Sequence, residues 1–482
     1  MVILSAGKPA IPRVVAFTQT RGISTLNTKP NNLQRGRSSS TSSTVFPEIK
    51  STQETAAKAP LPPLSALPTT VLLRSLLVAT ISSKPYLLLP SLSALSFLCK
   101  PRKGPLLNVD RNPILHAILK STFYKQFCAG ETHNEVRNTI QQLNNMGFQG
   151  TIMTYAKETV FDHKTNTQVG LGIADSTEGA TGELFCQQIE AWRTGTMETV
   201  ELLGENDYLA MKLTGAGPTV TTAFTNNTPP PPQMLSALHE ICTRCKERGV
   251  RILVDAESHH FLAGMLSLTL DLMRQFNTDG YASVYMTYQA YLKSTPATLA
   301  KHLAAASEDG FTLGLKLVRG AYIASDERSL IHDTKADTDN AYNSIAQGAL
   351  KQELGGFGIG SEKAFPSVNL FLASHNRESV LSAHTLHQQR LKDGLPTVPV
   401  GFAQLHGMSD EVSFSLLSMK GKGVEKSDPK VYKCSTWGGL GECLAYLLRR
   451  AIENRDAVGR TGDEFKALKG EVGRRVRGVF FG

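Results

Sequence analysis

Eight short runs of apolar and β-branched residues recur along the chain, and a segment with helical spacing follows each one. The runs lie at residues 150–156, 208–214, 250–256, 283–290, 312–319, 368–374, 398–404 and 431–436. Near-continuous apolar runs are typical of strands that are buried on both faces of a parallel sheet. Eight strand–helix units over roughly 300 residues predict a closed (β/α)8 barrel of the TIM type.

A doubly wound open sheet is the alternative α/β architecture. Its usual sign is a glycine-rich phosphate turn that follows a strand and opens a helix. The glycine-rich stretch 356–360 precedes a predicted strand instead. The barrel is therefore favoured, with residues 228–233 and 353–366 as loop insertions.

The positive charge of the chain is concentrated at its start. The net charge is +9, and residues 1–47 contain six basic residues and no Asp or Glu: Lys8, Arg13, Arg21, Lys29, Arg35 and Arg37. Without those six the remainder carries only +3 (9 − 6), so the charge gives no reason to expect nucleic-acid binding. The composition predicts a mitochondrial-type targeting segment, disordered, over residues 1–47. A disordered basic linker is the alternative.

The remaining boundaries follow from changes in composition. Residues 48–68, rich in Pro, Ala and Ser, read as a linker, and 69–146 as an N-terminal helical arm. Arg74, Lys84, Pro85 and Pro90 interrupt the apolar stretch 69–100, so we expect buried helices there rather than a membrane span. Peripheral membrane contact stays open. The barrel is expected over residues 147–460, and a C-terminal tail over 461–482.

The seven cysteines show no secreted-domain spacing, so reduced thiols are expected. Cys242 and Cys245 form a CxxC pair, but a structural zinc site needs four ligands and no second pair appears. We interpret both as ordinary helix positions and expect no metal site.

Polar residues follow most of the predicted strands at their carboxyl ends, where barrels place their functional sites. They are Lys212, Asp255, Glu257, Gln289, Lys316, Arg319, Tyr322, His375, Asn376, Gln404 and His406. Singly, each has an ordinary structural explanation. Together, several cations at one mouth repel each other unless an anionic ligand binds there.

The predicted last helix adds two more cations. Tyr446, Arg449, Arg450 and Glu453 are spaced i, i+3, i+4 and i+7, which places them on one helix face. Two guanidinium groups beside a tyrosine suit a small carboxylate, whose two oxygens match the planar fork. The alternative is a solvated face with an ion pair between Arg449 and Glu453. The mouth offers no nucleophile with an adjacent base, which favours chemistry carried by a cofactor.

Six motifs resemble, in order, those of the proline dehydrogenase (proline oxidase) family in its mitochondrial eukaryotic form. They lie at 253–257, 288–291, 316–322, 374–376, 404–408 and 446–454, and the resemblance spans roughly residues 110–460. It implies a distorted, FAD-containing (β/α)8 barrel. It also implies oxidation of L-proline to Δ1-pyrroline-5-carboxylate, with electrons passed to a membrane quinone.

The resemblance assigns roles position by position. Catalytic positions are Lys212, Asp255, Arg449 and Arg450, with the two arginines and Lys212 on the substrate carboxylate. The proline pocket is formed by Asp255, Leu317, Ala321, Tyr322, Cys434 and Tyr446, and Glu158 pairs with Arg449 to close it. Contacts to the flavin or its phosphates come from Gln289, Lys316, Arg319, Gly320, His375 and Asn376.

The chain departs from the family at two of these positions. Lys316 stands where bacterial members often carry Arg, which keeps the charge but loses bidentate geometry. Cys434 stands where many members carry a Tyr against the proline ring, and losing that wall removes ~1–3 kcal/mol of apolar contact. Three alternatives follow: the smaller side chain leaves room for a ring hydroxyl, it lowers the affinity for proline, or the neighbouring Trp437 fills the gap. A preference for proline over hydroxyproline is expected, with the reverse left open.

Three rival functions remain at this point. One is another flavin barrel, such as a folate reductase, and a second is a phosphate-binding lyase or aldolase without flavin. The third is a barrel that has lost proline oxidation and serves in binding or regulation. An anaerobic titration with L-proline separates them, because only the predicted enzyme has a flavin that proline bleaches.

Overall fold

The computed structural model describes residues 61–99, 106–155, 158–162, 167–171, 185–323, 326–422, 427–453 and 458–480. Within these ranges it gives no side-chain description for residues 158–162, 167–171, 445, 449, 450, 452, 453 and 458–461. The expected targeting segment and most of the expected linker lie outside the described residues.

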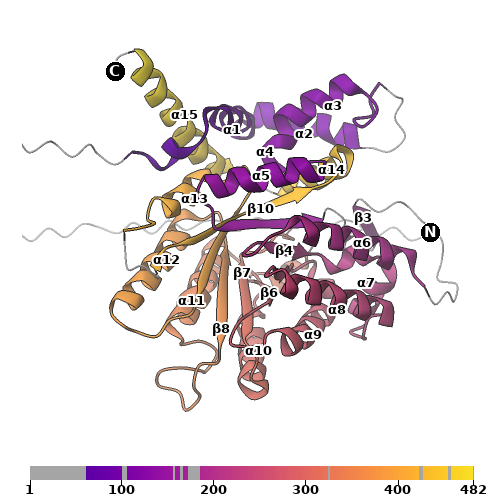
Figure 1. Ribbon diagram of the computed structural model, residues 1–482, viewed down its shortest axis with the longest axis vertical. Helices are drawn as coiled ribbons and strands as arrows, with labels where there is room; N and C mark the ends of the chain where they lie inside the picture. Colours follow the sequence, from indigo (N-terminus) through magenta and orange to yellow (C-terminus); the bar gives the residue numbers. More distant parts are fainter. Residues whose placement is uncertain are drawn as a thin grey trace, which may run out of the picture. The chain divides into compact units, whose positions relative to one another are not determined.

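Eight parallel strands close into a barrel, as the spacing of the apolar runs predicted. Their order around the barrel is β1-β10-β9-β8-β7-β6-β5-β4 (Figure 1). The strands are β1 Gly150–Tyr155, β4 Tyr208–Met211, β5 Arg251–Val254, β6 Val284–Gln289, β7 Leu313–Val318, β8 Val368–Ala373, β9 Val400–Leu405 and β10 Lys430–Trp437. Parallel pairing throughout is what right-handed strand–helix–strand units produce.

Helices cover the outside of the barrel between successive strands. They are α6 Gln187–Leu202, α7 Pro218–Thr225, α8 Pro232–Glu247, α9 His259–Phe276, α10 Thr295–Asp309, α11 Lys335–Lys351, α12 Arg377–Lys392 and α13 Asp410–Leu417. The helix after β10, α14 Leu440–Glu453, packs against the N-terminal helix α2 Pro85–Cys99 instead. Two short 3-10 turns, η3 Leu213–Ala216 and η4 Arg328–Leu330, lie in the connections. Cys242 and Cys245 are buried positions of α8, as predicted.

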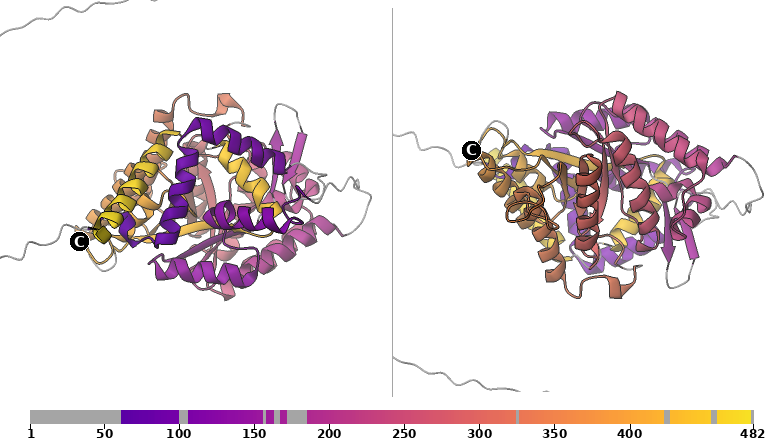
Figure 2. Two further views of the ribbon diagram at one scale, coloured as in Figure 1. Left: turned by 90° about the horizontal axis from the view of Figure 1, so that it is seen from above. Right: turned by 90° about the horizontal axis from the view of Figure 1, so that it is seen from below.

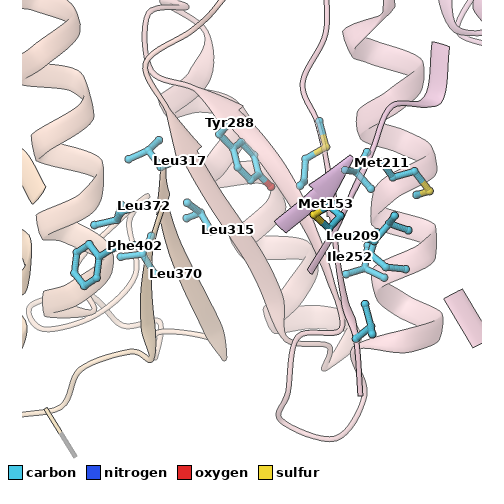
Figure 3. Packing of buried hydrophobic residues seen from close by; sticks show 14 of the residues in the cluster. Met153, Leu209, Met211, Ile252, Tyr288, Leu315, Leu317, Leu370, Leu372 and Phe402 are labelled. Atoms are coloured by element: carbon cyan, nitrogen blue, oxygen red, sulfur yellow. The ribbon is translucent and has the colours of Figure 1, made fainter. Parts of the chain in front are cut away.

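Strand residues alternate between two apolar layers. One layer packs the strands against the helices, and Figure 3 shows Leu315, Leu317, Leu370 and Leu372 in it. The other fills the barrel, where the rings of Tyr208, Tyr285, Phe371 and Tyr432 pack with centroids 4.9–6.2 Å apart. This aromatic plug closes the interior, so any ligand binds above it at the carboxyl ends of the strands.

The N-terminal arm packs beside the last barrel elements. It contains η1 Pro63–Ala66, α1 Thr69–Ser82, α2 Pro85–Cys99, α3 Pro113–Leu119, the π-turn η2 Lys120–Tyr124, α4 Lys125–Phe127 and α5 His133–Asn145. A β-hairpin, β2 Glu158–Asp162 with β3 Thr167–Leu171, follows β1. In Figure 2, α1 and α2 lie beside α14 and α15 when seen from above.

Two features of the arm differ from the expectation or extend it. Helices form at residues 69–99, but they are not buried: Leu72, Ser75 and Ala79 are the buried residues of α1, and Leu92 is that of α2. Apolar residues surround both helices, and such a pattern does not reveal which face finds a partner. Of the expected tail, 461–482, residues 461–480 form most of the helix α15 Val458–Phe480, which packs on α1.

Candidate active site

Two charged side chains from strands that are not neighbours meet at the carboxyl end of the barrel. Asp255 follows β5, and its backbone N–H donates to the carbonyl of Met211 at 3.0 Å. Nζ of Lys316, on β7, lies 2.6 Å from Oδ1 of Asp255. The two side chains are only 10% and 22% exposed. Because β6 separates the two strands, the ion pair spans part of the barrel mouth.

A contact between Lys212 and Tyr446 shows that α14 lies at the mouth of the barrel. Lys212 is buried at the end of β4, with Nζ 4.6 Å from the ring centroid of Tyr446 on α14. This is a cation–π distance. Nε1 of Trp192 donates to the Lys212 carbonyl at 2.9 Å and holds the backbone there. The structure therefore brings together four of the predicted residues, Lys212, Asp255, Lys316 and Tyr446, from four separate elements.

Glu257 and Gln289 form a buried network on the same side. The Glu257 carboxylate is 1% exposed and accepts the Thr214 backbone N–H at 3.1 Å and the Thr214 hydroxyl. Nε2 of Gln289 donates to the Glu257 carbonyl at 3.3 Å. Glu257 thus fixes the loop after β4 and the orientation of Gln289.

Arg319 ties the end of β7 to three other elements. Its guanidinium donates to Asp339 at 2.7 Å, to Ser374 at 2.6 Å and to Ser379 at 2.9 Å. It also stacks on the ring of Tyr342, with 4.3 Å between Cζ and the ring centroid. Sequence reasoning missed these partners, because their positions on α11, β8 and α12 carry no local signal.

Gly320 occupies a position that only glycine fits. Its φ is +137°, and a Cβ there would lie 2.5 Å from Cδ1 of Tyr291. Ala321 and the buried Tyr322 follow directly, and the Tyr322 carbonyl accepts the Asp326 N–H at 2.7 Å.

The predicted residues after β8 and β9 also have structural partners. Nε2 of His375 accepts the Leu405 N–H at 3.1 Å, and the Asn376 side chain caps α12 by accepting the Ser379 N–H at 3.0 Å. Gln404 is buried, accepts the Ser413 hydroxyl at 2.8 Å and donates to the Ser374 carbonyl at 3.2 Å. Nδ1 of His406 lies 3.0 Å from Oγ of Ser435, and burial lowers the His406 pKa to about 4.

The structure does not bring Leu317 to this group. Leu317 is fully buried between the strands and the helices, where it packs in the same layer as Leu315 (Figure 3). Lys316 points into the barrel, so the period of two along a strand sends its neighbour Leu317 to the opposite face.

Trp437 does not fill the space beside Cys434, so the structure contradicts this one of the alternatives for position 434. Nε1 of Trp437 donates to the Thr199 hydroxyl of α6 at 2.9 Å, and its ring lies 5.5 Å from the ring of His133. Cys434 instead packs at the edge of the interior cluster that contains Tyr432. The three-residue step along β10 sends the two side chains to opposite faces.

Arg449 and Arg450 lie in α14, and Glu158 lies in β2, but their side chains are outside the described part of the structure. Arg450 is one turn beyond Tyr446 on the same helix face. The hairpin strand β2 packs beside η3, which directly follows Lys212. The roles assigned to all three residues stay predictions.

Comparisons with known proteins identify relatives. The family model described as proline dehydrogenase matches residues 136–463. A hydroxyproline dehydrogenase of Bos taurus is 31% identical over 393 residues, which cover 75% of this chain and 82% of the relative. A probable mitochondrial proline dehydrogenase of Schizosaccharomyces pombe is 28% identical over 451 residues, covering 84% and 88%.

Solved structures share the fold. Proline utilization A (PutA) from Bdellovibrio bacteriovorus has a TM-score of 0.58 and 17% identity, over 80% of this chain and 38% of that chain. A bifunctional PutA protein has a TM-score of 0.52 and 16% identity, over 85% and 43%. The match to the family model extends over more than half of the sequence and includes the barrel and its last helix. The chain therefore belongs to the proline dehydrogenase family of oxidoreductases.

Proposed function

We propose that this protein oxidises L-proline to Δ1-pyrroline-5-carboxylate, with FAD as cofactor and a quinone as electron acceptor, in the first step of proline catabolism. The observation that carries the proposal is the gathering of Lys212, Asp255, Lys316 and Tyr446 above the aromatic plug. Cations close to one carboxylate and one ring suit a small amino acid beside an anionic cofactor.

The residues present fit FAD. Lys316 and Arg319 supply positive charge and Gln289 supplies an amide, and Gly320 directly follows Arg319 at the carboxyl end of β7. His375 and Asn376 would complete the contacts from β8. When bound, FAD would supply the acceptor, its N5, for a hydride from proline C5.

The protein's own residues orient the substrate. Lys212, Arg449 and Arg450 would hold the carboxylate through charge-assisted contacts, which fix the ring for reaction. Asp255, Ala321, Tyr322 and Tyr446 would shape the pocket, and Glu158 would close it by pairing with Arg449. Lys316 places a positive charge where negative charge accumulates during the reaction, which stabilises the transition state.

The test is an anaerobic titration of the purified protein with L-proline while the flavin absorbance is recorded. Proline-dependent bleaching supports the proposal. A colourless protein, or a flavin that only NADH bleaches, contradicts it. Arg450→Met should raise the proline KM at least tenfold and leave bound FAD intact, whereas loss of flavin at unchanged KM contradicts the assigned role.

Hydroxyproline is the second candidate substrate. Cys434 places no aromatic ring at the β10 position of the proposed substrate wall, Trp437 points away from the gap, and several relatives are named hydroxyproline dehydrogenases. Cys434→Tyr should therefore shift the ratio of proline to hydroxyproline turnover towards proline. An unchanged ratio contradicts this role of Cys434.

We also propose a mitochondrial matrix location with peripheral contact to the inner membrane. Relatives from S. pombe, Dictyostelium discoideum and Arabidopsis thaliana are named mitochondrial. Residues 61–109 contain no acidic residue, and α1 and α2 expose Leu73, Leu77, Leu89 and Phe97. Among the described residues no single helix has the length and apolar composition to cross a membrane, although α1 and α2, bent by 98°, qualify together.

A further inference from the structure

A cavity of about 220 Å³ lies between the N-terminal arm and the barrel. Its walls come from α1, α2, the turn after β9, the middle of β10, α14 and α15. We call it the arm cavity and define it by Ala79, Leu92, His406, Cys434, Tyr446 and Glu464. An engineered apolar cavity of about 150 Å³ holds benzene, so there is room here for one substituted ring.

The wall formed by the arm is apolar. Leu88, Leu92 and Leu95 of α2 line it. Its serine hydroxyls already have partners: Ser82 donates to the Val78 carbonyl at 2.9 Å, Ser91 donates to the Leu87 carbonyl at 2.8 Å, and Ser75 accepts from Nε2 of Gln126 at 3.0 Å. The wall therefore suits an apolar ring better than a second amino acid.

The arm cavity shares a wall with the proposed proline pocket. Cys434 and Tyr446 line the cavity. The Tyr446 ring also contacts Lys212 of the proposed pocket, whose Nζ lies 4.6 Å from the ring centroid. None of the proposed flavin contacts from β6 to β8 lines the cavity. A ligand in it would lie next to the reacting centre without occupying the carboxylate site.

The opposite faces of the same two helices carry exposed apolar residues. Leu73 and Leu77 of α1, and Leu89 of α2, are about half exposed. A compound dissolved in a lipid bilayer would meet these faces first and the cavity directly behind them. Such a compound is poorly soluble in water and needs an apolar binding site of this kind.

We propose that the arm cavity binds the electron acceptor of the reaction, an apolar compound of the quinone class, with Glu464 as a proton donor at its polar end. The inference rests on the proposed proline oxidation. Proline gives up two electrons and two protons as its C5–N bond becomes a C=N bond. A quinone takes up two electrons and two protons to become the quinol, so the reaction balances without another reactant.

Glu464 of α15 is suited to this task. Burial and the nearby Asp410 carboxylate raise its pKa to about 7, against the effects of Lys433 and of hydrogen bonds from the backbone of Ser409 and Asp410. Asp410 is itself paired with Lys433 at 2.7 Å, and His406 and Arg74 are the other charged or titratable groups of the cluster. A carboxyl group with a pKa near 7 both holds and releases a proton at neutral pH.

The experiment compares two acceptors with the full-length holoenzyme. One is a decyl-substituted benzoquinone, and the other is the water-soluble ferricenium ion, both with saturating L-proline. Leu92→Trp fills the arm cavity from α2 and should lower kcat/KM for the quinone at least tenfold, with the ferricenium rate unchanged. Ala94→Trp, on an exposed position of the same helix, is the matched control and should leave both rates unchanged.

The proton donor is tested separately, so that a folding defect of Leu92→Trp does not decide the question. Glu464→Gln should slow quinone reduction at least fivefold and remove an inflection near pH 7 from its pH profile, and it should leave ferricenium reduction unchanged. Equal losses with both acceptors would show that the cavity belongs to the proline pocket, and unchanged quinone rates in both variants would also overturn the inference. Absence of turnover with ferricenium in the unaltered protein would instead contradict the proposed function.

Discussion

At the scale of single residues, the Lys316–Asp255 pair decides how much positive charge the site offers to an anionic ligand. Lys316 is a buried cation with a carboxylate 2.6 Å away. A charge that is partly neutralised by a neighbour acts less strongly on a third group than an isolated one. At the proposed flavin site, the pair therefore gives a positive potential that is weaker than that of an unpaired lysine.

Changing either partner should move the flavin midpoint potential in opposite directions. Asp255→Asn leaves the Lys316 charge unopposed, which favours the more negative reduced cofactor and should raise the potential by on the order of 30 mV, equivalent to about 1.4 kcal/mol for two electrons. Lys316→Met should lower it by a similar amount. Spectroelectrochemical titration measures both shifts. Lys293→Met, in an exposed pair with Asp333, is the control, and shifts of the same sign in both site variants would contradict the account.

Gly320 shows how one backbone position constrains the site. Gly320→Ala should lower FAD occupancy and the melting temperature, because the methyl group meets the Tyr291 ring at a φ that L-residues rarely adopt. Gly310→Ala is the comparison, since its φ is also positive, at +73°, but no atom lies within 4 Å of the added Cβ. The two losses of stability, measured by thermal unfolding, should differ by about 1–3 kcal/mol. Equal losses would show that backbone strain alone, and not the ring, restricts position 320.

At the scale of elements, α15 fastens the N-terminal arm. The Arg475 guanidinium donates to the carbonyls of Leu64, Ser65 and Leu67 and to the Thr69 hydroxyl, which together form the start of the arm. It also pairs with Glu471 on its own helix. One side chain at the end of the sequence thus satisfies the backbone that leads into α1.

Arg475→Ala should destabilise the protein by roughly 1–3 kcal/mol, because several carbonyls lose a charged donor. Limited proteolysis should then cut faster near residues 61–68. Arg474→Ala is the matched control: Arg474 is 40% exposed and pairs with the same Glu471, but within the described part of the chain it donates to none of the arm carbonyls. Equal proteolysis rates in the two variants would argue against α15 as the fastening element.

At the scale of the whole molecule, buried histidines tie stability to pH. Burial lowers the pKa of His302, His384 and His406 to about 4, from an ordinary value of 6.5. The unfolded chain binds protons at these sites near pH 6.5 and the folded chain only near pH 4. The stability of the fold with these three histidines neutral is therefore fully present above pH 6.5 and is lost as the pH falls towards 4.

His384 is the sharpest test of this dependence. It is buried against Phe402, and neither ring nitrogen has a hydrogen-bond partner among the described residues. His384→Leu should raise the melting temperature and flatten its decrease between pH 7 and pH 5, because an orphaned polar group costs about 1–3 kcal/mol. His239→Gln, at an exposed position of α8, should change neither. An unchanged slope in His384→Leu would contradict the assigned role.

The fold and much of the site could be predicted from local patterns. A run of apolar residues marks each barrel strand in the sequence. The polar residues that follow the strands, such as Lys212 and Asp255, must all lie at the same end of a parallel barrel. Lys316 faces the barrel interior and Leu317 does not. The alternation of side chains along a strand predicts this difference, whereas the motif match assigned both residues to the site. The arm resisted prediction, because α1 and α2 are apolar on all sides.

The sequence by itself determined the number of barrel strands, their order along the chain and the end of the barrel at which charge gathers, since these follow from periodicity and from the handedness of strand–helix–strand units. Only the tertiary structure decided the partners: Asp255 for Lys316, Tyr446 for Lys212, Thr199 for Trp437, and Glu464 for the arm cavity. These residues lie tens to hundreds of positions apart. Contacts of that kind depend on the closure of the barrel and on the packing of α15, and no local pattern carries them.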